Sequence, residues 1–131
     1  VGIVTEVSDN FSSVMSVLHT KSKISAKLKL GNYVGTLVWT GGSPQIAKLS
    51  DIPVHVKMKI GDTVTTSGYS MIFPEGVMVG RVQQFKSYED NDFYDIDVKL
   101  STDFNNIRFV YVINNLLKNE LEELVKTTQQ E

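Results

Sequence analysis

The chain has 131 residues, of which 41% are hydrophobic and 21% are charged, as expected of one folded domain or of two very small ones sharing a core. Its 13 basic and 15 acidic side chains give a formal net charge of -2, which argues against a dedicated nucleic-acid-binding protein. The sequence has no cysteine, so disulfides, thiolate zinc sites and thiol catalysis are excluded.

The chain begins on VGIVTEV, an alternating strand pattern without an initiator methionine, a basic segment or a signal-peptide core, so we expect an excised fragment. Its longest uninterrupted apolar run, FVYVI at 109–113, is far shorter than the roughly 20 residues that a transmembrane helix needs. We therefore expect no transmembrane helix within these residues.

Up to about residue 113 the dominant hydrophobic period is two, which is typical of half-buried β-strands. The cleanest example is ISAKLKL at 24–30, where Ser25, Lys27 and Lys29 are expected to point to solvent. Turn-forming residues separate the later strand candidates, which are 33–40, 45–49, 54–60, 77–85, 94–100 and 108–113. Short strands at such close intervals indicate an all-β barrel or sandwich.

A boundary between two subdomains is expected at SDIP, because Pro53 cannot donate to a strand ladder. Five strand candidates precede it, and a sixth from residues 107–113 would complete a first barrel formed by residues 1–52. Residues 53–103 would then form a second barrel inserted into the first. A plain tandem order of the two barrels is the alternative.

The pattern changes to a helical one in the tail, residues 114–131. Leu117, Leu121 and Leu124 follow four-then-three spacing after an asparagine capping candidate, which predicts an amphipathic helix. Its leucines either pack on the barrel or contact another copy of the chain. Fewer than three heptads are present, which argues against a stable coiled coil formed by this segment alone.

The stretch KIGDTVTTSGYSMIFPEGVMVGRV at 59–82 is rich in turn signals. Gly61 and Asp62 favour a hairpin turn, because glycine accepts positive φ and the aspartate carboxylate can bond nearby backbone amides. Gly68 is expected to form a bend and Pro74 with Gly76 a second turn. Gly80, inside an otherwise apolar strand, predicts a bulge or the close approach of another backbone.

This stretch, with GIVTEVSDNFSSV at 2–14, GTLVW at 35–39 and LSDIP at 49–53, resembles the periplasmic part of the rod shape-determining protein MreC family. The resemblance covers residues 2 to about 113. The residues that carry it are Asn10, Phe11, Gly35, Pro53, Gly61, Asp62, Thr66, Ser67, Gly68, Phe73, Pro74, Gly76 and Gly80. It implies an all-β fold of two small six-stranded β-barrels, similar in outline to chymotrypsin-like proteases, with a short C-terminal helix.

The function that the resemblance implies is that of a non-catalytic scaffold of the cell-wall elongation machinery, without a cofactor. It would lie on the periplasmic side of the bacterial inner membrane, anchored only through an N-terminal helix that this sequence lacks. The implied partners are the elongation-specific class B penicillin-binding protein, MreD, RodA and MreB, together with self-association into dimers or filaments. The alternative function is a glycan-binding β-barrel module of the cell envelope.

Signals for catalysis and for metal binding are weak. A serine hydrolase needs a base beside its nucleophile, and the only imidazoles are His19 and His55, of which His55 is expected to face solvent. The acidic stretch 88–97 lacks the glycine and the late glutamate of an EF-hand loop, so it is interpreted as a polar hairpin tip. We therefore expect neither a catalytic site nor a metal site.

Three surface features allow both a structural and a functional interpretation. The basic cluster is either a solvated strand face or a peripheral electrostatic contact; it contains Lys21, Lys23, Lys27 and Lys29, with Lys57 and Lys59 as further members. Trp39, Tyr33 and Tyr69 either belong to the core or stack on a carbohydrate. The possible partner contacts Ile72, Phe73 and Val77 either form an exposed apolar patch or plug the second barrel.

Overall fold

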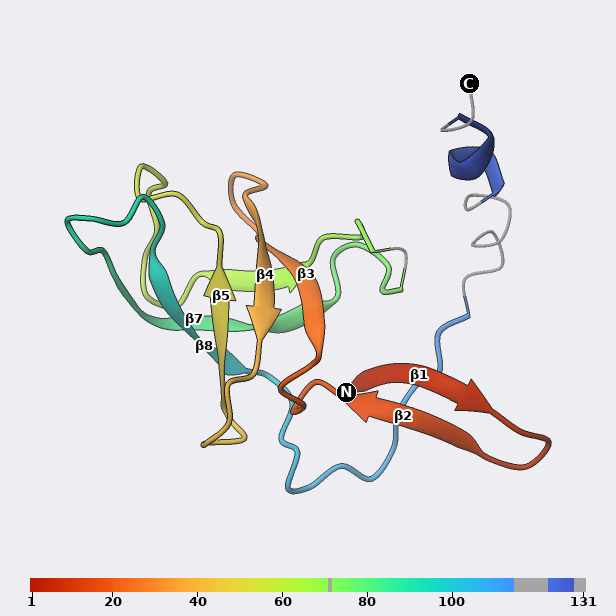
Figure 1. The fold of residues 1–131 in the computed structure, drawn as a ribbon. Helices are drawn as coiled ribbons and strands as arrows, with labels where there is room; N and C mark the ends of the chain where they lie inside the picture. The colour runs from red at the N-terminus through yellow and green to blue at the C-terminus, as the bar shows by residue number, and fades with distance from the viewer. Residues whose placement is uncertain (71, 115–122, 129–131) are drawn as a thin grey trace.

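The computed structural model describes residues 1–70, 72–114 and 123–128, and these form an all-β fold with one short helical segment (Figure 1). Eight strands follow one another within these described ranges. They are β1 (Gly2–Val7), β2 (Ser12–Ser16), β3 (Lys23–Leu28), β4 (Val34–Val38), β5 (Ile46–Ser50), β6 (Thr63–Thr66), β7 (Met78–Lys86) and β8 (Asp95–Leu100). The first two strands form a separate hairpin, and the other six form the barrel.

The barrel is closed, with its strands in the order β3-β4-β5-β8-β7-β6 and every neighbouring pair antiparallel. Closure comes from the pairing of β3 with β6, in which Ala26 lies opposite Thr66 and Leu28 opposite Val64. A closed barrel satisfies the backbone hydrogen bonds of all six strands and leaves no exposed sheet edge.

The core lies inside this barrel because alternate residues of each strand point inward. In β3 the side chains of Ile24, Ala26 and Leu28 are buried, while Ser25 and Lys27 between them face outward. Leu37, Leu49, Val64, Val82, Ile96 and Val98 fill the interior from the other five strands. The period-two pattern of the sequence is thus confirmed in the barrel strands.

Two glycines allow the small barrel to close tightly. A Cβ added at Gly80 would overlap the carbonyl oxygen of Lys99 on β8, and one added at Gly35 would overlap that of Ser50 on β5. Neither glycine has a positive φ, so the requirement is for space and not for an unusual backbone conformation. The expected close approach at Gly80 is confirmed, and a register shift between Val64 and Thr65 lies beside it.

The expectation of two six-stranded barrels, divided near Pro53, differs from this topology. Strands from both sides of that proline enter one barrel, because β5 pairs with β8 and β3 pairs with β6. Residues 1–52 supply three of its strands and residues 53–103 supply the other three. Neither an inserted nor a tandem second barrel occurs among the described residues, so the chymotrypsin-like outline has no counterpart there.

The predicted strand at 54–60 is also corrected. These residues form turns and coil, although Val56 and Met58 alternate with exposed residues and are buried against the core. The strand in this part of the chain is β6, which the turn-rich pattern of 59–82 concealed. Pro53 forms a single bridge to Phe93 and takes part in no longer ladder.

Residues 107–113 form no strand, which corrects the expectation that they complete a barrel. Their large apolar side chains are exposed, and those of Phe109 and Tyr111 are 92% and 98% accessible. Of the expected tail helix, residues 123–128 are helical with Leu124 exposed, whereas Leu117 and Leu121 lie outside the described residues. Over the part of the chain that the structure describes, no helix has the length and apolar character to cross a bilayer.

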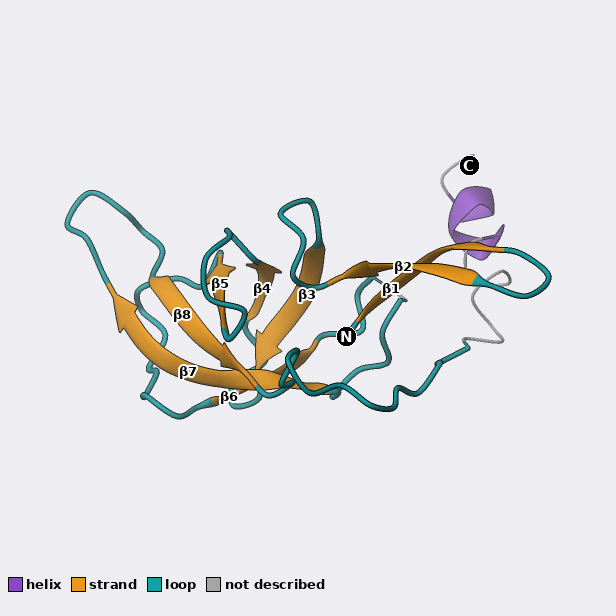
Figure 2. Ribbon diagram, turned by 90° about the horizontal axis from the view of Figure 1, so that it is seen from below, coloured by secondary structure: helices purple, strands orange, loops and turns teal. Residues whose placement is uncertain are grey.

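The β1–β2 hairpin extends away from the barrel, as Figures 1 and 2 both show. Its strands pair only with each other. Phe11 lies at its tip, where the Ser8 amide donates to the Phe11 carbonyl oxygen at 2.7 Å and the Phe11 amide donates to Ser8 Oγ at 3.2 Å. Asn10 lies in the same turn and is exposed.

Candidate functional site

The stretch 59–82 enters the barrel through a turn that Asp62 closes. The Lys59 amide donates to Asp62 Oδ2 at 2.9 Å, and the Asp62 amide donates to the Lys59 carbonyl oxygen at 3.1 Å. Gly61 adopts φ 94°, a left-handed conformation that favours glycine. The predicted turn is therefore present, but it leads from coil into β6 and does not join two strands of a hairpin.

The loop 67–77 connects β6 to β7 at the barrel rim, and Thr66 holds its returning arm. The Thr66 hydroxyl donates to the Pro74 carbonyl oxygen at 2.6 Å and accepts from the Val77 amide at 2.9 Å. The Thr66 backbone adds bonds to the Val77 carbonyl oxygen and the Gly76 amide at 2.8 and 3.0 Å. Four hydrogen bonds to one residue therefore fix the returning arm of the loop.

A second set of contacts attaches this loop to β3. Ser67 Oγ lies 2.6 Å from Ser25 Oγ, and the Ser67 amide donates to the Ser25 carbonyl oxygen at 3.1 Å. Gly68, with φ 80°, turns the chain where an added Cβ would meet the Glu75 side chain at 3.1 Å. Ser67 and Gly68 thus shape the departing arm as Thr66 shapes the returning one.

Lys27 of β3 makes an ion pair with Glu75 of the loop. The Lys27 side chain faces outward, as the alternation predicts, but it lies under the loop and is only 13% exposed. The hydrogen bond from Lys27, reinforced by its charge, lowers the pKa of Glu75. Because β3 positions are outward at every second residue, periodicity identifies the face of Lys27 but not its distant partner.

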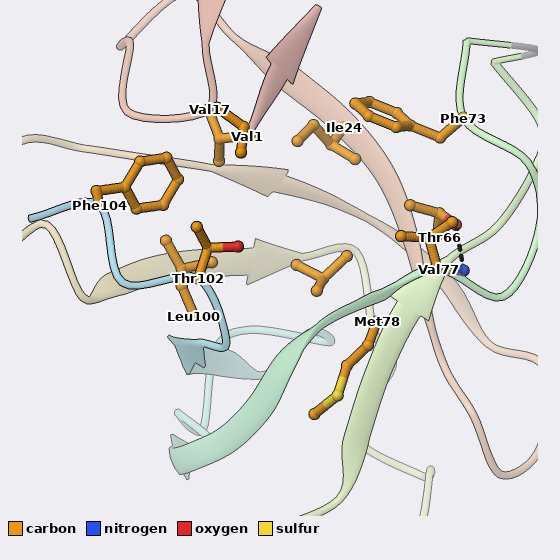
Figure 3. Close-up of a pocket in the computed structure, with 11 residues that line it drawn as sticks. Val1, Val17, Ile24, Thr66, Phe73, Val77, Met78, Leu100, Thr102 and Phe104 are labelled. Atoms are coloured by element: carbon orange, nitrogen blue, oxygen red, sulfur yellow. Dashed lines mark hydrogen bonds between the residues drawn. The ribbon is translucent and has the colours of Figure 1, made fainter. Parts of the chain in front are cut away.

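Several apolar side chains in and beside the loop 67–77 are partly exposed. Ile72, Val77 and Met78 are 40%, 39% and 43% exposed, and Phe73 is half-buried against the core. Figure 3 shows the Phe73 ring directed toward Ile24, with Val77 beside Thr66. Of the three expected contact residues, Ile72 and Val77 are thus partly exposed, while Phe73 packs on the first barrel strand.

A small apolar cavity of about 60 Å³ is lined in part by Val77 and Met78 (Figure 3). It is lined from the loop, the barrel rim, the base of the hairpin and the segment after β8; the lining includes Val17, Ile24, Phe73, Val77, Leu100 and Phe104. Ligand pockets are typically several hundred Å³ in volume, so this cavity is too small for a cofactor or a substrate. The partly exposed apolar side chains in and beside the loop are better suited to a contact between proteins.

The residues considered for catalysis are not arranged for it. The Lys21 amide donates to His19 Nδ1 at 3.0 Å, and the His55 ring meets the Tyr33 ring edge-on at a centroid distance of 6.1 Å. Within the described ranges neither imidazole hydrogen-bonds a serine hydroxyl. In the same part of the chain no three His, Asp or Glu side chains are grouped to hold a metal ion.

The acidic stretch 88–97 forms the tip between β7 and β8 and the start of β8. Lys48 of β5 pairs with Asp95 and Asp97 on the outer face of the barrel. The hydrogen bond to Asp97 raises the pKa of Lys48 more than burial lowers it. These carboxylates therefore serve cross-strand ion pairs.

The aromatic residues considered for glycan stacking are far apart. Tyr33 precedes β4 and Trp39 follows it, so about 20 Å of extended strand separates them at 3.3 Å per residue. Trp39 Nε1 donates to the Ser43 carbonyl oxygen at 2.9 Å. Tyr69 lies in the loop 67–77 and is exposed. Tyr33 and Trp39 thus do not form one stacking platform.

A model of a family described as rod shape-determining protein MreC, barrel core, matches residues 1–114. The cell shape-determining protein MreC of Streptococcus pneumoniae is 26% identical over 119 residues, covering 88% of this chain and 44% of that protein. The chain therefore spans less than half the length of this relative.

Two solved structures share the fold. The major periplasmic domain from the cell shape-determining filament MreC has a TM-score of 0.61 at 27% identity, over 77% of this chain and 63% of that one. A complex between penicillin-binding protein (PBP2) and MreC from Helicobacter pylori gives a TM-score of 0.61 at 22% identity, over 75% of this chain and 59% of that one.

Proposed function

The chain belongs to the MreC family, and we propose that it is a non-catalytic scaffold that controls cell shape by binding and organising peptidoglycan synthases. The polar side chains that stand out in the stretch 59–82 hold the backbone in place. The scaffold role that we propose therefore depends on the surface of the protein. Thr66, Ser67 and Asp62 use their side chains to fix turns.

The observation that carries this proposal is the exposure of three apolar side chains at the barrel rim, which we call the apolar patch: Ile72 and Val77 of the loop 67–77, and Met78 at the start of β7. Apolar side chains on a surface favour contact with another protein, because contact removes them from water. The frame of hydrogen bonds around Thr66 holds the loop in place before a partner arrives, which reduces the entropy lost on binding.

The partner that we propose for this patch is the elongation-specific class B penicillin-binding protein. The complex of a penicillin-binding protein with MreC from Helicobacter pylori, whose fold this chain shares, supports the choice. Binding would favour one conformation of the synthase, as any ligand with unequal affinity for two states does. No catalytic group of the scaffold is needed for such an effect.

The wider setting of the proposal follows the family resemblance. The chain would act on the periplasmic side of the inner membrane, which is the compartment named for one related MreC domain. MreD, RodA and MreB would be further members of the complex, and the scaffold would associate with itself as dimers or filaments. The membrane anchor would be an N-terminal helix outside these residues.

The proposal is tested by measuring binding of the chain to the ectodomain of the class B penicillin-binding protein from the same organism. Ile72→Asp places a charge in the patch and should weaken binding at least tenfold, because a buried unpaired carboxylate is costly. Val54→Asp is the matched control, since Val54 is 38% exposed, similar to the 40% of Ile72, and lies outside the loop. Circular dichroism confirms that both variants fold.

Equal affinities of the Ile72→Asp and Val54→Asp variants would contradict the assignment of the patch. Absence of binding by the unmodified chain would contradict the partner. Binding of peptidoglycan fragments that changes the fluorescence of Trp39 would instead support the alternative, a glycan-binding module.

A further inference from the structure

A second surface feature, which shares Met78 with the apolar patch, lies on the outer face of β6. It is a groove of about 520 Å³ lined by side chains from β3, β6, β7 and the loop 67–77. The lining residues are Lys27, Lys29, Thr63, Thr65, Glu75, Gly76, Met78 and Arg81. Three of these are cationic and one is anionic.

Strand register extends this positive charge across the sheet. Thr63 of β6 lies opposite Arg81 of β7, and Arg81 lies opposite Lys99 of β8. On the other side, the Lys29 amide donates to the Thr63 carbonyl oxygen at 3.0 Å. Directly paired residues share one face of a sheet, so Lys29, Thr63, Arg81 and Lys99 form a row across neighbouring strands about 4.8 Å apart.

The three cations of this row make no ion pair with the described residues. Glu75 is paired with Lys27, and the carboxylates of β8 are paired with Lys48. Asp62, beside Thr63 in the chain, has its carboxylate on the Lys59 amide. The row therefore carries a net positive charge, although the whole chain has a formal charge of -2.

Hydroxyl donors accompany these cations. Thr65 lines the groove and is only 6% exposed, and no described residue hydrogen-bonds its Oγ1. Thr63, two residues before Thr65 on β6, lines the same groove. Phosphate oxygens accept hydrogen bonds from hydroxyl, ammonium and guanidinium groups together. Among the residues that the structure describes, no aromatic side chain lines the groove, so sugar rings or bases have no platform on which to stack.

We propose that this groove and the adjoining Lys99 bind a linear polyanion whose charges are phosphates, laid across β6, β7 and β8. A row of cations at strand spacing matches a chain of repeated charges better than a single ion. The proposal goes beyond the scaffold function and does not depend on it, because the cations and hydroxyls that it uses are not members of the apolar patch.

The test measures binding of long-chain inorganic polyphosphate to the chain by isothermal titration calorimetry at several salt concentrations. Arg81→Gln and Lys99→Gln should each weaken binding roughly fivefold and lower the slope of log K against log salt by about one. Lys86→Gln, at the exposed end of β7, is the matched control and should leave both values unchanged. Thr65→Val should weaken binding without changing the salt slope.

Equal losses from the Lys86 control and from Arg81→Gln would overturn the site, because the binding would then reflect overall charge. Equal affinity for poly-L-glutamate would overturn the preference for phosphate. Tighter binding to vesicles of anionic phospholipid than to polyphosphate would overturn the polymer in favour of a membrane surface. The expected order is polyphosphate first, then the other two probes.

Discussion

The side chain of Thr66 is expected to contribute more to the stability of the loop 67–77 than its size suggests. Thr66→Val keeps the shape of the residue, which is 3% exposed, but removes the hydroxyl. The Pro74 carbonyl oxygen and the Val77 amide then lose the partner that they have at 2.6 and 2.9 Å. An unsatisfied buried group costs about 1–3 kcal/mol, and these two are partly buried, so we expect a loss of about 2–4 kcal/mol.

The adjacent Thr65 provides the control. Its hydroxyl is buried and has no partner among the described residues, so Thr65→Val should be neutral or stabilise the protein by about 1 kcal/mol. Urea unfolding at equilibrium measures the change in the free energy of unfolding for both variants. In thermal unfolding, each kcal/mol should appear as a difference of roughly 4 °C in Tm. Thr66→Ser, which keeps the hydroxyl, should recover most of the loss.

Equal effects of the two valine substitutions would refute this reasoning, since they differ only in whether the hydroxyl has partners. A loss below about 0.5 kcal/mol for Thr66→Val would also refute it, because the loop would then satisfy its backbone groups in another way.

Two further predictions concern the same half of the barrel. Gly80→Ala should lower the free energy of unfolding, measured by chemical denaturation, by more than about 2 kcal/mol, because its Cβ would overlap the Lys99 carbonyl oxygen. The control is Gly41→Ala, at φ 94° with open space around it, which should cost only about 1 kcal/mol. The lowered pKa of Glu75 means that its ion pair with Lys27 stabilises the fold fully above the ordinary pKa of glutamate, and that this contribution is lost as pH falls through the lowered value. The Tm of the unmodified chain should therefore decline more steeply with acidification than that of Glu75→Gln, and parallel declines would contradict the prediction.

Local patterns predicted much of the barrel and several of its special positions. Period-two alternation located β3, β4, β5, β7 and β8, because each has one face in the core and one in solvent. The expected turn at Gly61 and Asp62 and the expected close approach at Gly80 are present, although the turn leads from coil into β6 and is not that of a hairpin. Such features follow from the chemistry of single residues.

The errors arose where distant segments decide the structure. Val56 and Met58 alternate with polar residues because they cover the core. This coil segment therefore has the same sequence pattern as a half-buried strand. Counting strands on each side of Pro53 could not reveal that β3 pairs with β6 and β5 with β8, since no local signal specifies a partner many residues away. The Lys27–Glu75 pair and the row through Arg81 and Lys99 were not predicted, because they too join residues that are far apart in the sequence.

The closed barrel explains why these surface features are confined to a few places. The closed barrel offers no edge for strand addition, so a partner of the barrel must use side chains on its outer face or loops at its rim. The rim loop 67–77 presents apolar groups, and the face of β6, β7 and β8 presents unpaired cations. Both surfaces meet at Glu75, which lies in the loop and lines the groove. Because its pair with Lys27 joins the loop to β3, a polyanion in the groove that competes for Lys27 would remove one of the contacts that hold the loop in place.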